Sequence, residues 1–124
     1  MPESAKVRHY KELKIWQRSM ALAGDIYKLT CKFPAAETYG LTSQMRRAAV
    51  SVPSNIAEGQ ARSGTREFLQ FLSHASGSLA ELETQILLSV ELGFCAQSNA
   101  GLLTGEIAEL QKMVAAIRRK LAVL

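Results

Sequence analysis

The sequence has little of what disulfide frameworks, membrane spans and export require. It contains two cysteines in 124 residues, too far apart for a Cys-x-x-Cys metal site, so we expect free thiols at Cys31 and Cys95. Its apolar runs are far shorter than the ~20 residues that span a bilayer. Residues 1–14 lack the apolar centre of a secretory signal. These absences predict a cytoplasmic protein with no membrane partner.

The sequence is also poor in groups suited to catalysis. His9 and His74 are its two histidines, and we expect each to be a surface or packing residue rather than a general base. No Glu-x-x-His pair of the kind used by di-iron bundles occurs, and no glycine cluster ends in the Gly-Lys-Ser/Thr of a phosphate loop. The sequence therefore predicts no enzyme activity, no catalytic residue, no metal site, no cofactor and no small-molecule substrate.

Positive charge is missing from the middle of the chain. Residues 67–111 contain six Asp or Glu and no Lys or Arg. Residues 1–66 contain eleven Lys or Arg against five Asp or Glu, and residues 112–124 contain four against none. This separation indicates either electrostatic docking between surfaces or binding of a polyanion by the basic blocks. The alternative is that acidic and basic helices balance each other within one chain.

The basic blocks supply candidate RNA contacts without a recognised nucleic-acid motif. Aromatic residues make up only 6% of the chain, and Trp16, Phe68 and Phe71 have the spacing of core residues, so no base-stacking platform is indicated. Charge and shape would then dominate any recognition of RNA. The RNA-binding candidates are Arg46, Arg47, Arg62, Arg66, Lys112, Arg118, Arg119 and Lys120.

Helical periodicity is present over most of the length. Apolar residues recur every three or four positions over about residues 11–31, 42–63, 65–93 and 98–124, and no segment alternates with the period of a strand. Because the connectors are short, successive helices are expected to be antiparallel. The sequence predicts an all-α fold in which residues 1–124 form a single domain. This domain is an antiparallel up-down-up-down four-helix bundle, with residues 1–10 as a flexible N-terminal segment.

Three residue types mark the expected helix ends. Thr42 is a candidate N-cap for the second helix, and Ser63 or Thr65 for the third, because hydroxyls accept hydrogen bonds from first-turn amides. Gly93 is a candidate left-handed stop for the third helix.

The first and third helices carry more apolar surface than one core requires. The first helix has two apolar stripes, one with Leu13, Trp16, Met20, Ala23 and Tyr27 and one with Ile15, Ser19, Leu22, Ile26 and Leu29. Phe71, Leu87 and Leu88 lie off the main apolar seam of the third helix. We therefore expect a homo-oligomer that buries part of this surface between subunits. A monomer with scattered exposed apolar side chains is the alternative.

The second helix keeps its spacing on both sides of a proline. Pro53 removes the amide that would bond the carbonyl of Ala49, which costs ~3 kcal/mol in a helix interior. Neighbouring polar side chains are expected to bond that carbonyl or to contact a partner subunit or ligand. Because Arg47 and Glu58 lie three turns apart, we expect each to pair with another helix. The sequence predicts a kink, with kink and subunit-contact candidates at Arg47, Ser51, Pro53, Ser54, Asn55 and Glu58.

Three segments carry a resemblance to a known family: YKELKIWQRSMALAGDIY, YGLTSQMRRAAVSVPSNIAEGQAR and REFLQFLSHASGSLAELETQILLSVELGF. Over about residues 10–122 the chain resembles the bacterial four-helix bundle family named for proteins encoded in intervening sequences of 23S ribosomal RNA genes. The resemblance implies a four-helix bundle, a homopentamer, no established catalytic activity, and association with structured RNA or a ribonucleoprotein. A protein-protein interaction scaffold or accessory subunit without nucleic-acid binding is the alternative function.

Overall fold

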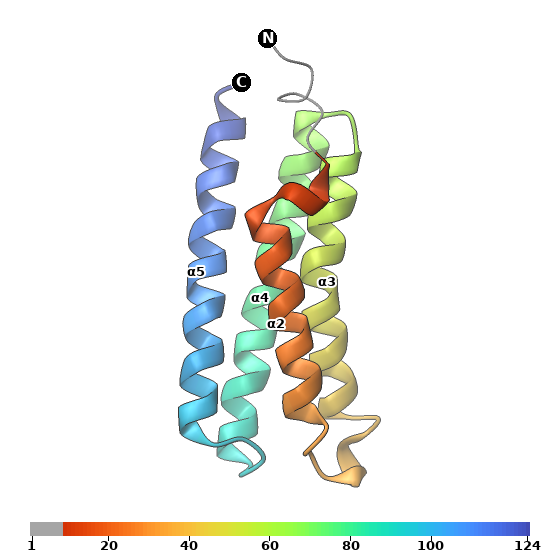
Figure 1. Cartoon of the computed structure of the whole chain (residues 1–124), viewed down its shortest axis with the longest axis vertical. Coiled ribbons are helices and arrows are strands. Elements are labelled where there is room, and N and C mark those ends of the chain that lie inside the picture. The colour runs from red at the N-terminus through yellow and green to blue at the C-terminus, as the bar shows by residue number, and fades with distance from the viewer. Residues whose placement is uncertain (1–8) are drawn as a thin grey trace.

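Four long helices form the part of the chain that the computed structural model describes, residues 9–124 (Figure 1). They are α2 (Lys14–Thr30), α3 (Leu41–Ala61), α4 (Thr65–Glu91) and α5 (Gln97–Ala122), with short 3-10 helices η1 (Tyr10–Glu12) and η2 (Ala35–Glu37). No strand occurs in these residues, so the predicted all-α four-helix fold is confirmed. None of the described helices has both the length and the apolar character needed to cross a membrane.

Little of the expected flexible segment, residues 1–10, can be compared with the structure. Residues 1–8 lie outside the described part of the chain. Tyr10 belongs to η1, and the Nδ1 atom of His9 accepts a hydrogen bond from the amide of Lys11 at 3.2 Å. Regular structure is therefore present at Tyr10, within the segment that was expected to be flexible.

Contacts between neighbouring helices show the direction in which each helix runs. Met45, early in α3, lies 3.4 Å from the hydroxyl of Ser89, late in α4. Gly59, late in α3, lies against Phe71, early in α4. α3 and α4 are therefore antiparallel, and Figure 1 shows successive helices alternating in direction along the whole bundle. Contacts of α2 with α3, α3 with α4, α4 with α5 and α5 with α2 close the bundle.

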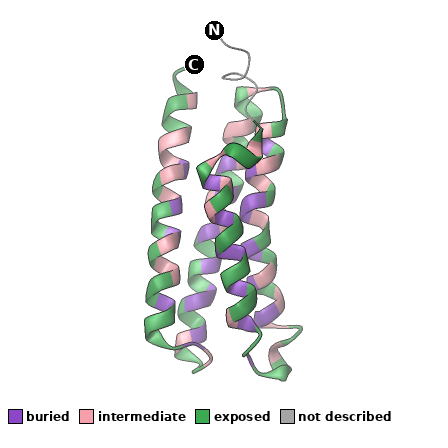
Figure 2. Ribbon diagram, viewed as in Figure 1, coloured by how far each residue is buried: buried purple, intermediate pink, exposed green. Residues whose placement is uncertain are grey.

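The core is built from one apolar stripe of each helix (Figure 2). On α2, the stripe that includes Ile15, Leu22 and Ile26 is buried, whereas Met20 and Tyr27 of the other stripe remain 47% and 43% exposed. Each fully buried large aliphatic side chain contributes ~1.5–3 kcal/mol relative to exposure in water. The largest fully buried side chains are Ile15, Leu22, Ile26, Met45, Val52, Ile56, Leu72, Leu79, Leu82, Ile86, Ile107 and Leu110.

The predicted cap of α3 is wrong. The helix begins at Leu41 after Gly40, and Thr42 is buried within the first turn rather than preceding it. The Oε1 atom of Glu37 accepts a hydrogen bond from the amide of Leu41 at 3.0 Å. A carboxylate from η2 therefore satisfies a first-turn amide, which is the capping role expected of the threonine hydroxyl at a different amide.

At α4 the predicted start is wrong and the predicted end is confirmed. The N-cap residue is Gly64, and no side chain caps the helix, so neither Ser63 nor Thr65 has the expected role. After α4, Gly93 has a φ of +79°, the left-handed conformation that lets the chain turn away from a helix end.

Candidate functional site

Cations from distant parts of the sequence meet at one end of the bundle. Because α4 and α5 are antiparallel, the start of α4 lies beside the end of α5, and Leu69, Arg118 and Arg119 line one hollow of about 470 Å³. The connector between α3 and α4 lies at the same end (Figure 1). We call this end the basic pole and define it by Arg62, Arg66, Arg118, Arg119 and Lys120.

Four of the five cations of the basic pole are unpaired. Arg66, Arg118, Arg119 and Lys120 are exposed and form no ion pair with any residue in the described range 9–124. A guanidinium carries five N–H donors in a planar fork that fits phosphate oxygens, and an ammonium acts as a point charge. The four unpaired side chains are therefore free to contact an anion.

Arg62, the fifth cation, is already engaged within the chain. Its Nη2 atom lies 2.9 Å from Oε2 of Glu58, and its guanidinium lies 5.2 Å from the ring centroid of Phe71. The carboxylate partly neutralises Arg62, so this residue adds less to the attraction of a polyanion than the other four.

The hollow at the basic pole is apolar beneath its charged rim. Leu69, Ala115 and Ala122 line it together with the two arginines. No hydroxyl or amide side chain lines this hollow, so arginine is the only type of side chain in it that can donate hydrogen bonds to a nucleic acid. The arrangement suits contact with backbone phosphates.

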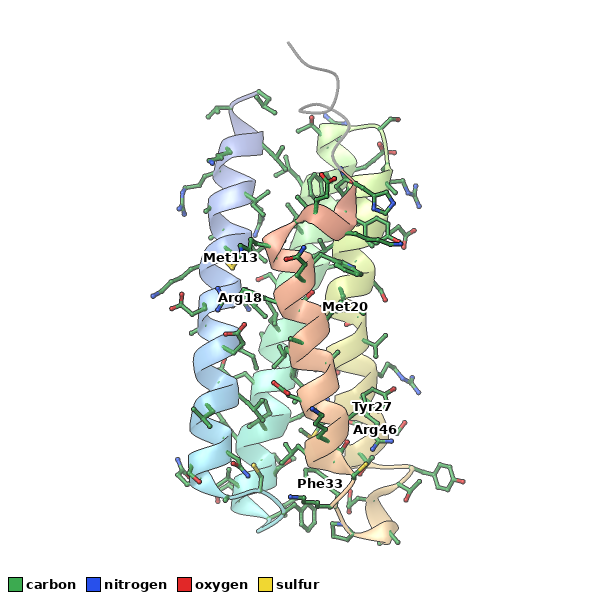
Figure 3. All side chains as sticks on the ribbon, viewed as in Figure 1. Arg18, Met20, Tyr27, Phe33, Arg46 and Met113 are labelled. Carbon is green, nitrogen blue, oxygen red and sulfur yellow. The ribbon has the colours of Figure 1, made fainter. Side chains whose placement is uncertain are left out.

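The remaining three RNA-binding candidates lie elsewhere. Lys112 precedes the end of α5 by more than two turns, and its Nζ atom lies 3.4 Å from Oε2 of Glu109. Arg46 and Arg47 lie early in α3, at the opposite end of the bundle from the basic pole (Figure 3). The eight candidates therefore do not form one surface.

Arg46 joins α3 to the end of α2. Its Nε atom donates to the hydroxyl of Thr30 at 2.8 Å, and its Nη2 atom donates to the carbonyl of Tyr27 at 3.3 Å. The guanidinium lies 4.5 Å from the ring centroid of Tyr27 (Figure 3). Arg47 is exposed and forms no ion pair with the described residues. Arg46 is thus a structural contact, whereas Arg47 is free.

A groove runs between α2 and α3, on the side away from the core. It consists of two hollows of about 630 and 480 Å³ that share Tyr27 and Val50. Arg46 and Arg47 line the first hollow, and neither hollow is lined by an acidic residue. We call this feature the α2–α3 groove and define its apolar lining as Trp16, Met20, Tyr27, Val50, Pro53 and Ala57.

The α2–α3 groove is not among the sites expected from the sequence. Its signal was the second apolar stripe of the first helix, to which Trp16, Met20 and Tyr27 belong. What could not be read from spacing is that Val50 and Pro53 of α3 continue that stripe on the neighbouring helix.

The kink and subunit-contact candidates of α3 lie partly between helices. The hydroxyls of Ser51 and Ser78 are 2.6 Å apart and connect α3 to α4. Ser51 also donates to the carbonyl of Ala48, and Asn55 donates to the carbonyl of Ser51, each at 2.7 Å. The acceptors of these two bonds are the carbonyls of Ala48 and Ser51. Neither bond is made to the carbonyl of Ala49, which was the expected acceptor. α3 is one helix through the buried Pro53, and the kink stays a prediction.

The remaining kink and subunit-contact candidates differ in how available their side chains are to a partner. Glu58 pairs with Arg62 one turn away, not with another helix, so that expectation is wrong. Ser54 is exposed and lines the second hollow of the α2–α3 groove. Of the six kink and subunit-contact candidates, Arg47 and Ser54 are therefore the ones most available to a partner.

The described residues contain no cluster suited to metal binding or redox chemistry. No three His, Cys, Asp or Glu side chains in the range 9–124 are placed to hold a metal ion. His74 is exposed beside Phe71, with ring centroids 6.0 Å apart. Cys31 and Cys95 are both free thiols, and burial raises the pKa of the Cys95 thiol. A raised pKa lowers the fraction of reactive thiolate.

Comparisons with known proteins give a family and a related fold. The family model described as 23S rRNA-intervening sequence protein matches residues 11–116. A solved structure of a protein with unknown function, from the S23 ribosomal protein family of Bacteroides thetaiotaomicron VPI-5482, has a TM-score of 0.76. The similarity covers 84% of this chain and 97% of that one at 19% identity, so it shows a shared fold. No curated protein matches the sequence.

Proposed function

Because the chain belongs to the 23S rRNA-intervening sequence protein family, we propose that it is a non-enzymatic cytoplasmic homo-oligomer that binds structured RNA or a ribonucleoprotein. The resemblance noted in the sequence favours a homopentamer. The observation that carries the RNA part of the proposal is the convergence of four unpaired cations at the basic pole.

Electrostatics supports a polyanion as the ligand of the basic pole. Arg66 is separated by more than fifty residues from Arg118, Arg119 and Lys120 in sequence, yet all four lie at one end of the bundle. A protein that neutralises phosphates releases condensed counterions, so log affinity falls linearly with log salt. With four unpaired cations we expect a slope of roughly −3 to −4 per bound subunit.

The aromatic side chains near the basic pole favour recognition of the backbone over recognition of bases. Phe68 and Phe71 are half-buried, and Phe71 is covered by Arg62. Single-stranded RNA is usually bound by bases stacked on exposed aromatic rings. A folded RNA, which presents closely spaced phosphates, fits the basic pole better.

The test combines purification with charge reversal. The protein is purified from native lysate with and without ribonuclease, its mass is measured by light scattering, and the ratio of ultraviolet absorbances reports bound nucleic acid. RNA affinity is then compared for the wild type and the variant Arg118→Glu/Arg119→Glu/Lys120→Glu. We expect at least a tenfold loss of affinity and a salt slope that is smaller by about three.

A matched control separates position from net charge. The variant Lys28→Glu/Lys32→Glu/Lys112→Glu makes the same change in net charge at exposed residues outside the basic pole. It should keep most of the affinity and nearly the wild-type salt slope. Equal losses in both triple variants would mean that net charge, and not the basic pole, governs binding.

A second candidate function is a protein-protein interaction scaffold or accessory subunit without nucleic-acid binding. The observation in its favour is the α2–α3 groove, whose partly exposed apolar lining is unusual for a surface that meets only water. A native assembly that is free of RNA before any ribonuclease treatment would favour this candidate.

A further inference from the structure

Most of the large exposed apolar side chains on the helices gather in two separate patches. In the α2–α3 groove, Met20, Tyr27 and Val50 are 47%, 43% and 41% exposed. The other patch lies in the last turns of α4 and its C-cap, where Leu87, Leu88 and Leu92 are 49%, 46% and 51% exposed. A monomer leaves both patches in water, at a cost that grows with the apolar area exposed.

The patch on α4 is bordered by carboxylates. Glu81, Thr84, Leu88 and Glu91 recur at helical spacing on the exposed face of this helix. The surrounding segment, residues 67–111, contains no Lys or Arg. We call this feature the α4 ridge and define it by Glu81, Thr84, Leu87, Leu88 and Glu91.

The carboxylates of the α4 ridge have few partners within the chain. Glu91 forms no ion pair with the described residues. Glu81 accepts one long hydrogen bond, at 3.4 Å, from Nε2 of Gln85. Both are therefore available to a cation outside their own subunit.

The α2–α3 groove has the opposite charge. Arg46 and Arg47 line its first hollow, and no acidic side chain lines either hollow. The groove is concave and basic with an apolar lining, whereas the α4 ridge is a helix face with apolar and acidic side chains. The two surfaces match in apolar character and are opposite in charge, which is the pattern of complementary docking partners.

We propose that the α4 ridge of one copy docks in the α2–α3 groove of a second copy, with Glu91 facing Arg47. This inference rests on the homo-oligomer of the proposed function and not on its RNA ligand. Because the two surfaces differ, each copy keeps one groove and one ridge for further neighbours, and such head-to-tail contacts form a ring when the rotation closes. Neither surface includes a residue of the basic pole, so the RNA-binding end stays open.

Blocking each surface separately tests the proposal. Val50→Arg places a charged side chain in the groove, and Leu88→Arg places one on the ridge. Both native side chains are more than 40% exposed, so the bundle should fold, which circular dichroism and cooperative melting check. Light scattering on ribonuclease-treated protein should show an oligomer for the wild type and a monomer for each variant alone.

Mixing the two variants gives the decisive measurement. The Val50→Arg copy keeps an intact ridge and the Leu88→Arg copy keeps an intact groove, so an equal mixture should form a dimer of one copy of each and nothing larger. Dimer formation also shows that both variants are folded. Leu102→Arg, at a residue that is 76% exposed and lies outside both surfaces, should keep the wild-type mass.

Four results would overturn the inference. A variant that keeps the wild-type mass removes its surface from the interface, and a mixture without a dimer contradicts head-to-tail docking. The uncharged variants Val50→Gln and Leu88→Gln should weaken assembly in the same pattern, and their failure to do so would also count against it. A monomeric wild type would remove the homo-oligomer of the proposed function as well, whereas RNA affinity is judged separately from the basic-pole variants.

Discussion

Arg18 of α2 and Glu106 of α5 form an ion pair with two hydrogen bonds. The Nε and Nη2 atoms of Arg18 donate to the two carboxylate oxygens of Glu106 at 2.9 and 2.7 Å. The hydrogen bond with Glu106 raises the pKa of Arg18 further above physiological pH. α2 and α5 are the most sparsely packed pair of neighbouring long helices, so this ion pair is a principal tie between them.

Removing the ion pair between Arg18 and Glu106 should weaken the packing of α5 against α2. We expect Arg18→Gln and Glu106→Gln each to lower the midpoint of thermal unfolding by a few degrees, and the double variant to lose little more than either single one. Lys112→Gln, in the exposed pair with Glu109, should have no measurable effect. Additive losses in the double variant would show that the two side chains act independently.

Close packing between α3 and α4 predicts that Gly59 does not tolerate alanine. A Cβ atom at this residue would lie 2.6 Å from Cβ of Phe71 and 3.0 Å from Cδ1 of Phe68. Overpacking of this kind costs ~1–3 kcal/mol, which exceeds the gain in helix propensity of at most ~1 kcal/mol. Urea denaturation of Gly59→Ala should therefore show a net loss of stability.

Gly105 on α5 provides the matched control for Gly59. A Cβ atom there would meet nothing within 4 Å, so Gly105→Ala should gain ~0.5–1 kcal/mol from helix propensity alone. If both alanine variants changed stability in the same direction, close approach at Gly59 would not be the cause.

A buried amide on α4 predicts a stabilising substitution. Gln85 is 6% exposed, and its Oε1 atom has no hydrogen-bond partner among the described residues. An unsatisfied buried acceptor costs ~1–3 kcal/mol, so Gln85→Met, which keeps a similar volume, should raise the free energy of unfolding by about 1 kcal/mol. Differential scanning calorimetry measures the change.

Gln111 on α5 is the comparison for Gln85. It accepts from the hydroxyl of Ser76 at 2.8 Å and donates to the carbonyl of the same residue at 3.0 Å. Gln111→Met should therefore lower stability. Opposite signs for the two Gln→Met changes are expected, and a loss in both would show that Gln85 has a partner that the subunit alone does not reveal.

The two thiols should differ in reactivity. Cys31 is exposed, whereas Cys95 is 7% exposed and burial raises the pKa of its thiol. Iodoacetamide at neutral pH should modify Cys31 first, and Cys95 should react at a comparable rate only after denaturation. Mass spectrometry of peptides over time measures both rates, and similar rates in the native protein would contradict the burial of Cys95.

Periodicity predicts the helices well because each helix needs one apolar face. It shows that Ile15, Leu22 and Ile26 share a face and that Met20 and Tyr27 share another, but not which face is covered. The structure buries the first set, so the second becomes the lining of the α2–α3 groove. That choice depends on how α3 and α5 pack against α2 and is not encoded in any one segment.

The spacing of residues in the sequence could not predict which side chains of different helices are in contact. The pairing of Arg18 with Glu106 depends on the axial offset of α2 and α5, and the bond from Leu41 to Glu37 depends on the fold of the preceding turn. At the candidate site, antiparallel packing brings Arg66 to the end of α5, whereas Lys112 stays more than two turns away. Sequence alone shows that these residues are basic, not which of them are neighbours.

The alternating directions of the helices have an electrostatic consequence for the basic pole. A helix carries roughly half a positive charge at its N-terminus and half a negative charge at its C-terminus. α2 and α4 begin toward the end of the bundle at which α3 and α5 finish, so these macrodipoles largely cancel there (Figure 1). The potential at that end is therefore set mainly by side chains, and its reach into physiological solvent is about one Debye length, ~8 Å.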